Sequence, residues 1–263
     1  MKKLFIFLSF VFLLYSKSIF ADALDVAIEN IDRTPENMQR DQYRNPKATL
    51  NFFGIKPNMS VIELWPSRGW YSEILNPFLE PEGNFIGADF DPNYGSWTPK
   101  VIKRNAKSRA NSKTLSGMKM TTLSLNNDPL AEKESVDMVL TFRNLHNWLK
   151  AEILMDVFNK SYAALKPGGI FGVVEHRALA DSSLENMKKS GYVTEELTIE
   201  YAKKAGFILV ASSEINANPK DGTIHPKGVW TLPPSLRLGE EDRAKYLAIG
   251  ESDRMTLKFM KPI

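Results

Sequence analysis

The chain has 263 residues and no cysteine, with 34 Lys and Arg against 31 Asp and Glu. Without cysteine, disulfide bonds, thiolate catalysis and thiolate metal sites are excluded. The first 21 residues hold three lysines and no acid. The remainder is therefore neutral and offers no global charge for nucleic acid, whose binding depends on neutralising phosphates.

The N-terminus has the pattern of a secretory signal peptide. Lys2 and Lys3 precede an apolar stretch over residues 4–15, and small residues follow around Ala21 and Ala23. About 12 apolar residues are too few for a membrane span, which needs roughly 20. We therefore expect removal of residues 1–21, with cleavage after Ala21 or Ala23. The mature protein is expected to be periplasmic or secreted, without a membrane span.

Two further parts are expected after the signal peptide: a helical N-terminal extension over residues 22–45, broken at Pro35, and one α/β domain over residues 46–263. In the domain, strand-like and helix-like segments alternate, which is typical of βαβ units in a parallel sheet. Strands are predicted at residues 60–64, 85–88, 120–125, 136–142, 170–175, 207–215 and 255–260. Helices are predicted at residues 70–79, 99–111, 149–165 and 194–205, the last one starting at Thr194 and ending before Gly206.

Residues 216–253 interrupt this alternation. They contain four prolines and show little periodicity. Long insertions of this kind in a compact domain are usually functional loops or lids. We therefore predict a long loop excursion between the last two strands.

Residues 61–71 are the most informative stretch of the chain. They read as a buried strand, a tight turn and a helix start. Ligands of open α/β sheets bind at such a place, because backbone amides at the helix N-terminus point outward. Glu63, at the end of the strand, would face a cationic or hydroxylated part of the ligand.

Five sequence motifs carry a resemblance to a known family. They are ELWPSRGWY (63–71), ADFDP (88–92), DMVLTFRNLHNW (137–148), LKPGG (165–169) and IGESDRMTLKF (249–259). With them the chain resembles the class I S-adenosylmethionine-dependent methyltransferases, and specifically a secreted bacterial subfamily of predicted methyltransferases. The resemblance implies a Rossmann-like α/β fold, with a seven-stranded, mostly parallel sheet whose last strand is antiparallel. It also implies S-adenosylmethionine as the cofactor, lying across the carboxyl ends of the first strands.

The resemblance assigns cofactor-binding residues one by one. Glu63 matches the acid near the methionyl amino group, and Gly69 matches the last glycine of the glycine-rich turn. Asp89 matches the acid that takes the ribose hydroxyls, with Asp91 as a close second. Trp65 and Asn144 complete the predicted cofactor site. The class usually has glycine where this chain has Trp65 and Ser67, and the subfamily has glycine at Ser67 and Arg68.

Polar residues at the carboxyl ends of the strands form the candidate chemical face, because these ends meet at one edge of the sheet. His146 is the first candidate for a general base, since neutral imidazole can take a proton near pH 7. Glu175 and His176 are the second candidates. Three arginines could orient an anionic substrate, since guanidinium binds carboxylate or phosphate in bidentate fashion: Arg143, Arg177 and Arg254. The three dispersed histidines lack the spacing of a zinc site, so no metal is expected.

The sequence thus predicts a methyltransferase that acts on an unidentified small acceptor, with no nucleic-acid partner. The main alternative is an exported binding protein of the same fold whose cofactor motif has degenerated. A third alternative is an enzyme of another class that uses the same polar face. Structural roles also remain open: Glu63 and Asp89 as strand-end caps, His146 as a hydrogen-bonded structural residue, and Asp253 with Arg254 as a salt bridge that closes the excursion. The oligomeric state is left open.

Overall fold

A computed structural model describes residues 23–263. The predicted signal peptide at residues 1–21 lies outside this part of the chain. No helix within residues 23–263 combines the length and the apolar character that crossing a membrane requires.

The core of the fold is a seven-stranded sheet with the order β3-β2-β1-β4-β5-β7-β6. Its strands are β1 (Ser60–Leu64), β2 (Asn84–Phe90), β3 (Lys119–Leu123), β4 (Val136–Phe142), β5 (Leu165–His176), β6 (Ile208–Ser213) and β7 (Arg254–Met260). Strand β7 pairs antiparallel with both β5 and β6, whereas the other neighbouring strands pair parallel. The predicted fold class, with six parallel strands and an antiparallel last strand, is confirmed.

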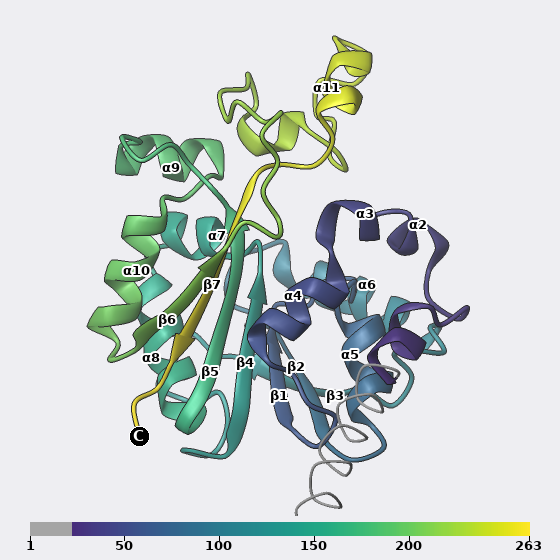
Figure 1. Cartoon of the computed structure of the whole chain (residues 1–263), viewed down its shortest axis with the longest axis vertical. Coiled ribbons are helices and arrows are strands. Elements are labelled where there is room, and N and C mark those ends of the chain that lie inside the picture. The colour runs from purple at the N-terminus through teal and green to yellow at the C-terminus, as the bar shows by residue number, and fades with distance from the viewer. Residues whose placement is uncertain (1–22) are drawn as a thin grey trace, which may run out of the picture.

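Helices cover both faces of the sheet, with α4, α5 and α6 on one side and α8 and α10 on the other (Figure 1). The helices are α2 (Pro35–Met38), α3 (Asp41–Arg44), α4 (Pro46–Phe53), α5 (Ser72–Leu79), α6 (Thr98–Ala110), α7 (Leu145–Lys150), α8 (Leu154–Ala164), α9 (Leu184–Ser190), α10 (Glu195–Lys204) and α11 (Arg243–Ile249), with a short 3₁₀ turn, η1 (Gly228–Thr231). Val61 belongs to the core on the α4–α5 side and Ile62 to the core on the α8–α10 side. Burial on both faces explains why β1 and β4 read as continuous apolar runs.

The structure differs from the predicted elements in several places, and one of them is helix α4, which was not predicted. The predicted helix at 149–165 is two helices, because Glu152 between them adopts a left-handed conformation with φ of +63°. Helix α9, with Ser183 as its N-cap, was not predicted. In the extension, Pro35 starts helix α2 instead of breaking a longer helix, since a first helical residue needs no intrahelical N–H bond.

The excursion at residues 216–253 is an ordered cap that contains η1 and α11. The Asn216 amide donates to Thr49 Oγ1 and to Thr256 Oγ1. The Asp221 carboxylate accepts from Tyr192 Oη at 2.9 Å and from the Asp253 backbone at 2.8 Å. The excursion and helices α2 and α3 lie beyond the same end of the sheet (Figure 1).

Candidate functional site

A cavity of about 280 Å³ opens at the carboxyl ends of β1 and β4, under the excursion. In the sheet β1 lies between β2 and β4, so the chain order reverses at this point. Such a switch point is where open α/β sheets bind their ligands. The cavity is lined by Arg44, Glu63, Trp65, Pro66, Ser67, Trp70, Tyr71, Phe142, Arg143, Asn144, His146, Asn147, His176, Val229, Trp230, Pro233, Pro234 and Ser235.

The structure thus brings six of the twelve predicted site residues to one cavity: Glu63, Trp65, Arg143, Asn144, His146 and His176. The Asn144 amide also ties the turn after β4 to β1, because it donates to the Leu64 carbonyl at 3.0 Å. A second, wider cavity of about 1010 Å³ adjoins the first and shares His146, Asn147 and Trp230 with it.

His146 and Glu175 form a buried imidazole–carboxylate pair at the edge of the cavity. His146 Nδ1 lies 3.0 Å from Glu175 Oε1. The carboxylate also accepts from the Leu145 backbone at 2.6 Å and from the His176 backbone at 2.8 Å. Because an ionised carboxylate only accepts hydrogen bonds, His146 carries its proton on Nδ1. The His146 Nε2 atom therefore keeps a lone pair that can accept a proton.

His176 sits next to this pair, with its ring centroid 5.4 Å from that of His146. Its Nδ1 lies 2.5 Å from Ser252 Oγ. Burial, with repulsion from His146, lowers the pKa of His176 well below its usual value. His176 is therefore neutral at physiological pH.

His146, Glu175 and His176 are also residues of the types that bind metal ions. The donor atoms of His146, Glu175 and His176 lie within 4.8 Å of one another. Both Glu175 oxygens, however, already accept N–H bonds. In this arrangement the Glu175 carboxylate fixes the orientation of the His146 imidazole.

Glu63 has the position expected of a ligand-facing acid at the end of β1. Its side chain is 4% exposed and accepts from Ser72 Oγ at 2.6 Å. Burial raises the pKa of Glu63 to about 7. The effect of burial is larger than the opposing effects of the Ser72 hydrogen bond and the Arg44 charge, which lower this pKa. The carboxyl can thus change its protonation state near neutral pH.

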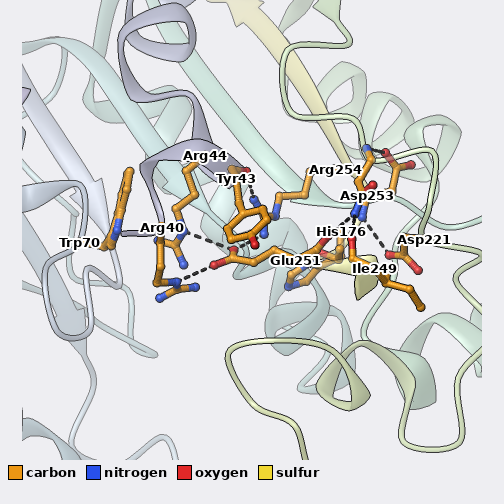
Figure 2. A network of polar contacts seen from close by, with 12 residues as sticks. Arg40, Tyr43, Arg44, Trp70, His176, Asp221, Ile249, Glu251, Asp253 and Arg254 are labelled. Carbon is orange, nitrogen blue, oxygen red and sulfur yellow. Dashed lines mark hydrogen bonds and ion pairs between the residues drawn. The ribbon is translucent and has the colours of Figure 1, made fainter. Parts of the chain in front are cut away.

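Arginine side chains from distant segments gather beside the cavity. Arg40 and Arg44 point toward Glu251 from the N-terminal extension, and Arg254 binds the same carboxylate (Figure 2). Burial would raise the pKa of Glu251, but the guanidinium groups, Arg254 first, hold it below its usual value. Arg143 lines the cavity and acts electrostatically on Arg44. We call Arg40, Arg44, Arg143 and Arg254 the arginine cluster.

Trp65 fills the space next to the end of β2. It has a φ of +48°, at a position where the class usually has glycine. Its ring centroid lies 4.4 Å from that of Phe90, 4.8 Å from Tyr94 and 5.3 Å from Trp148. Only 4% of Trp65 is exposed.

The two acids predicted to take the ribose hydroxyls do not line either cavity. Asp89 is buried and binds Arg109 Nη2 at 2.9 Å. Asp91 accepts from the Leu125 and Asn93 backbones at 2.9 and 2.7 Å, and these N–H groups lower its pKa. In this conformation both carboxylates are satisfied within the protein, and their role as cofactor ligands stays a prediction.

Gly69 has a packing role in the turn after β1, and its predicted role in cofactor binding stays a prediction. Its φ is +85°, and a Cβ atom at this position would lie 2.7 Å from Leu115 Cδ1. The glycine is thus required by the turn and by Leu115.

Arg177 and Arg254 are likewise paired with acids of the protein, and their role as substrate ligands stays a prediction. Arg177 binds Asp253, Glu195 and Glu214 at 2.7–3.1 Å and does not line the cavity. Arg254 binds Glu251 and the Tyr43 carbonyl. The alternative that Asp253 and Arg254 pair with each other is wrong, because Asp253 pairs with Arg177 and Arg254 with Glu251.

Sequence analysis missed Arg44, which lines the cavity and is 3% exposed. It lies at the end of α3, in the extension for which no site role was predicted. No local pattern around it indicates a binding residue. A contact between residues 44 and 251 could be found only from the tertiary structure.

Comparisons with solved structures agree with this architecture. A methyltransferase from Aquifex aeolicus, described as SAM dependent, aligns with a TM-score of 0.52 at 14% identity, over 89% of this chain and 96% of its own. A protein from Galdieria sulphuraria, assigned as a sarcosine dimethylglycine methyltransferase, gives 0.56 at 14% identity, over 84% of each chain. The fold is that of the class I methyltransferases.

The same fold also occurs in a protein with a different reaction. The [4+2]-cyclase SpnF aligns with a TM-score of 0.54 at 15% identity, over 89% of this chain and 86% of its own. No protein-family model matches the chain, and neither does any curated protein. At these identities the likeness establishes the class I methyltransferase fold, while the chemistry has to be argued from the cavity.

Proposed function

We propose that this protein is a methyltransferase that uses S-adenosylmethionine and acts on a small acceptor. One observation carries the proposal: a buried carboxyl at the end of β1 and an imidazole oriented by a carboxylate line the same cavity at the switch point of a class I methyltransferase fold. The fold is the argument for S-adenosylmethionine as the methyl donor. The imidazole is the argument for an acceptor that loses a proton.

The residues of the cavity fit the amino-acid half of this cofactor. Glu63 can accept hydrogen bonds from an ammonium group. Glu63 Oε2 accepts from Ser72, whereas Glu63 Oε1 has no hydrogen-bond partner within residues 23–263 and can face the ammonium. When bound, S-adenosylmethionine supplies a methyl group on a sulfonium, which is transferred to a nucleophile.

The nucleoside half fits only after a side chain moves. Trp65 packs on Phe90, next to Asp89, and Asp89 itself is held by Arg109. We therefore propose that the Trp65 indole leaves Phe90 when the cofactor binds. The indole nitrogen is buried without a partner in the described structure, so little hydrogen bonding would be lost in this movement.

The protein's own part in the reaction is to position the acceptor and to take its proton. His146 Nε2 is the atom that would accept the proton, because Nδ1 is hydrogen-bonded to Glu175. Trp230, Pro233 and Pro234 cover the cavity and limit the entry of water. The wider adjoining cavity, which shares His146, gives the acceptor a route of approach.

Calorimetric titration with S-adenosylmethionine and S-adenosylhomocysteine tests the proposal. We expect micromolar binding, roughly −8 kcal/mol, and at least tenfold tighter binding by Trp65→Gly, in which the indole is removed. Trp65→Phe tests the same idea if the glycine variant does not fold. Trp97→Gly is the matched control, because Trp97 packs on Phe90 and Tyr94 but does not line the cavity. Absence of binding by the wild type and all variants would contradict the proposal.

A second candidate function is an exported binding protein that kept the fold and lost the cofactor. The packing of Trp65 on Phe90 and the pairing of Asp89 with Arg109 favour this candidate. It predicts no response to S-adenosylmethionine in the titration, even for Trp65→Gly, although the cavity still binds another ligand. The two candidates are thus separated by one series of variants.

The compartment is a separate proposal, which rests on the N-terminal sequence. We propose export to the periplasm or the medium, driven by the charged and apolar pattern of residues 1–21. Cell fractionation with N-terminal sequencing should find a chain that starts at residue 22 or 24. A cytoplasmic chain that starts at Met1 would contradict it.

A further inference from the structure

The arginine cluster carries more positive charge than its surroundings compensate. The Glu251 carboxylate accepts hydrogen bonds from Arg40 at 2.5 Å, from Arg44 at 3.5 Å and from Arg254. Glu175 is the second carboxylate that acts on the cluster, through Arg143. Four guanidinium groups against two carboxylates leave a charge of +2. Glu63 removes part of this charge, since its pKa of about 7 leaves it only partly ionised at neutral pH.

Other acids close to the cavity are already paired. Asp41 binds Arg33 Nη1 at 2.8 Å. Glu73 accepts from Thr34 and Asn37 and lies 4.0 Å from Arg33. These two carboxylates therefore belong to Arg33 and the start of α2. They do not reach the guanidinium groups that line the cavity.

Two members of the cluster, Arg44 and Arg143, line the cavity. Arg44 is 97% buried, and its Nη2 atom has no partner within residues 23–263. Arg143 lines the cavity, and its side chain makes no hydrogen bond or ion pair with any described residue. Burial and repulsion from Arg254 lower the pKa of Arg143 to about 10. A buried cation such as Arg44 is costly unless an anion pairs with it.

We infer that the cavity binds an anionic acceptor, a small molecule with a carboxylate or phosphate group held between Arg44 and Arg143. Guanidinium groups bind such oxyanions through paired N–H donors. Trp70 helps to hold the Arg44 guanidinium in place, because this group stacks over the Trp70 ring at 4.5 Å from the ring centroid. The assignment of this anion to the acceptor rests on the proposed methyltransferase function, whereas the anion site itself does not.

The charge of the proposed cofactor indicates that it is not the anion in question. The amino-acid half of S-adenosylmethionine is a zwitterion, and the sulfonium adds a further positive charge. Its net charge is therefore positive, and it does not offset the positive charge of the arginine cluster. A separate anion in the cavity would offset that charge and favour the sulfonium. Binding of the two ligands should consequently be cooperative.

Calorimetric titration of the purified protein with inorganic phosphate, and with acetate, at constant ionic strength tests the anion site. We expect phosphate to bind in the millimolar range or tighter, and Arg143→Gln to weaken it at least tenfold. Arg143→Gln is expected to fold, since the Arg143 side chain has no described partner. Arg68→Gln is the control, because Arg68 is an exposed arginine of the neighbouring turn that does not line the cavity. Equal affinity in the wild type and Arg143→Gln would overturn the inference, as would the absence of phosphate binding.

A second titration distinguishes acceptor from cofactor as the source of the anion. S-adenosylmethionine is titrated with and without saturating phosphate. Tighter binding with phosphate supports a separate acceptor site, and competition would show that the site takes the cofactor carboxylate, which overturns the acceptor assignment. If phosphate binds through Arg143 while S-adenosylmethionine does not bind at all, the anion site stands and the proposed function fails.

Discussion

Glu175 illustrates how one buried carboxylate organises a site. It accepts from the backbones of Leu145 and His176 and from His146 Nδ1, so it joins the start of α7 to the end of β5. These three donors satisfy the buried carboxylate, as a buried polar group requires. The same bonds leave His146 with a single tautomer, which is what a general base requires.

Replacing Glu175 by Gln should therefore reduce stability and disturb the His146 tautomer. The Gln amide nitrogen cannot accept hydrogen bonds, so at least one buried N–H group loses its partner, at about 1–3 kcal/mol. Urea unfolding measures the loss, and ¹⁵N spectra of the histidine ring report the tautomer. The exposed Glu196→Gln is the control. An unchanged free energy of unfolding and an unchanged spectrum would contradict this role.

Glu63 should make stability depend on pH in a defined window. Its pKa is about 7 in the folded protein and 4.5 as a model carboxyl, so the folded state binds the proton more tightly. Its contribution is complete below pH 4.5 and is lost as the pH rises through 7, by about 3 kcal/mol. Glu63→Gln should remove this decline, as urea unfolding at pH 5 and pH 8 can show. If Glu63→Gln keeps the full wild-type decrease in the free energy of unfolding between pH 5 and pH 8, other groups cause that decrease.

Among the elements, the short helix α3 supplies Arg44 to the cavity, and helix α2 precedes it in the extension. They have four residues each, too few to be stable alone. Arg33 fixes them by binding Asp41 and the Ile28 carbonyl. In this way the extension becomes a wall of the cavity and delivers Arg40 and Arg44 to Glu251.

Helix α10 offers a test of an element that was predicted from sequence. Thr194 Oγ1 accepts from the Leu197 backbone at 3.2 Å, as the sequence pattern at its start predicts. Thr194→Ala should lower the free energy of unfolding by about 1 kcal/mol, because one N–H group at the helix start loses its acceptor. Thr194→Ser keeps the capping oxygen and should lose less in thermal or urea unfolding. Equal losses in the two variants would exclude a capping effect.

For the whole molecule, the excursion at 216–253 connects binding to dynamics. It supplies Val229, Trp230, Pro233 and Pro234 to the cavity, and it is held at its base by Asp221 and Asn218. A ligand in the cavity would contact this cap directly. Ligand binding should therefore stabilise it more than the sheet.

Hydrogen exchange measures this effect. Amides of residues 228–232 and of Ser235 should exchange more slowly when phosphate or S-adenosylmethionine is bound, because opening of the cap then requires release of the ligand. Amides of β3, at the far edge of the sheet, serve as the internal reference. Equal protection of both regions would indicate a general stabilisation without a specific contact to the cap.

The fold and part of the site follow from the order of residues alone. Apolar runs bounded by turn residues determine where strands lie, and the carboxyl ends of parallel strands must share one edge. For this reason Glu63, Arg143, His146 and His176 could be assigned to one cavity before any coordinates were known. The predicted β1 and β4 have the same bounds as the observed strands.

Which partner each side chain takes was decided only by the tertiary structure. Arg109 neutralises Asp89, Arg177 binds three acids, and Arg44 reaches Glu251 across the whole sequence. Pairings of this kind depend on which charges packing brings within a few ångströms, and periodicity contains no such information. The direction of the Trp65 indole belongs to the same category, since a side chain at a left-handed turn residue points where the surrounding aromatic rings leave room.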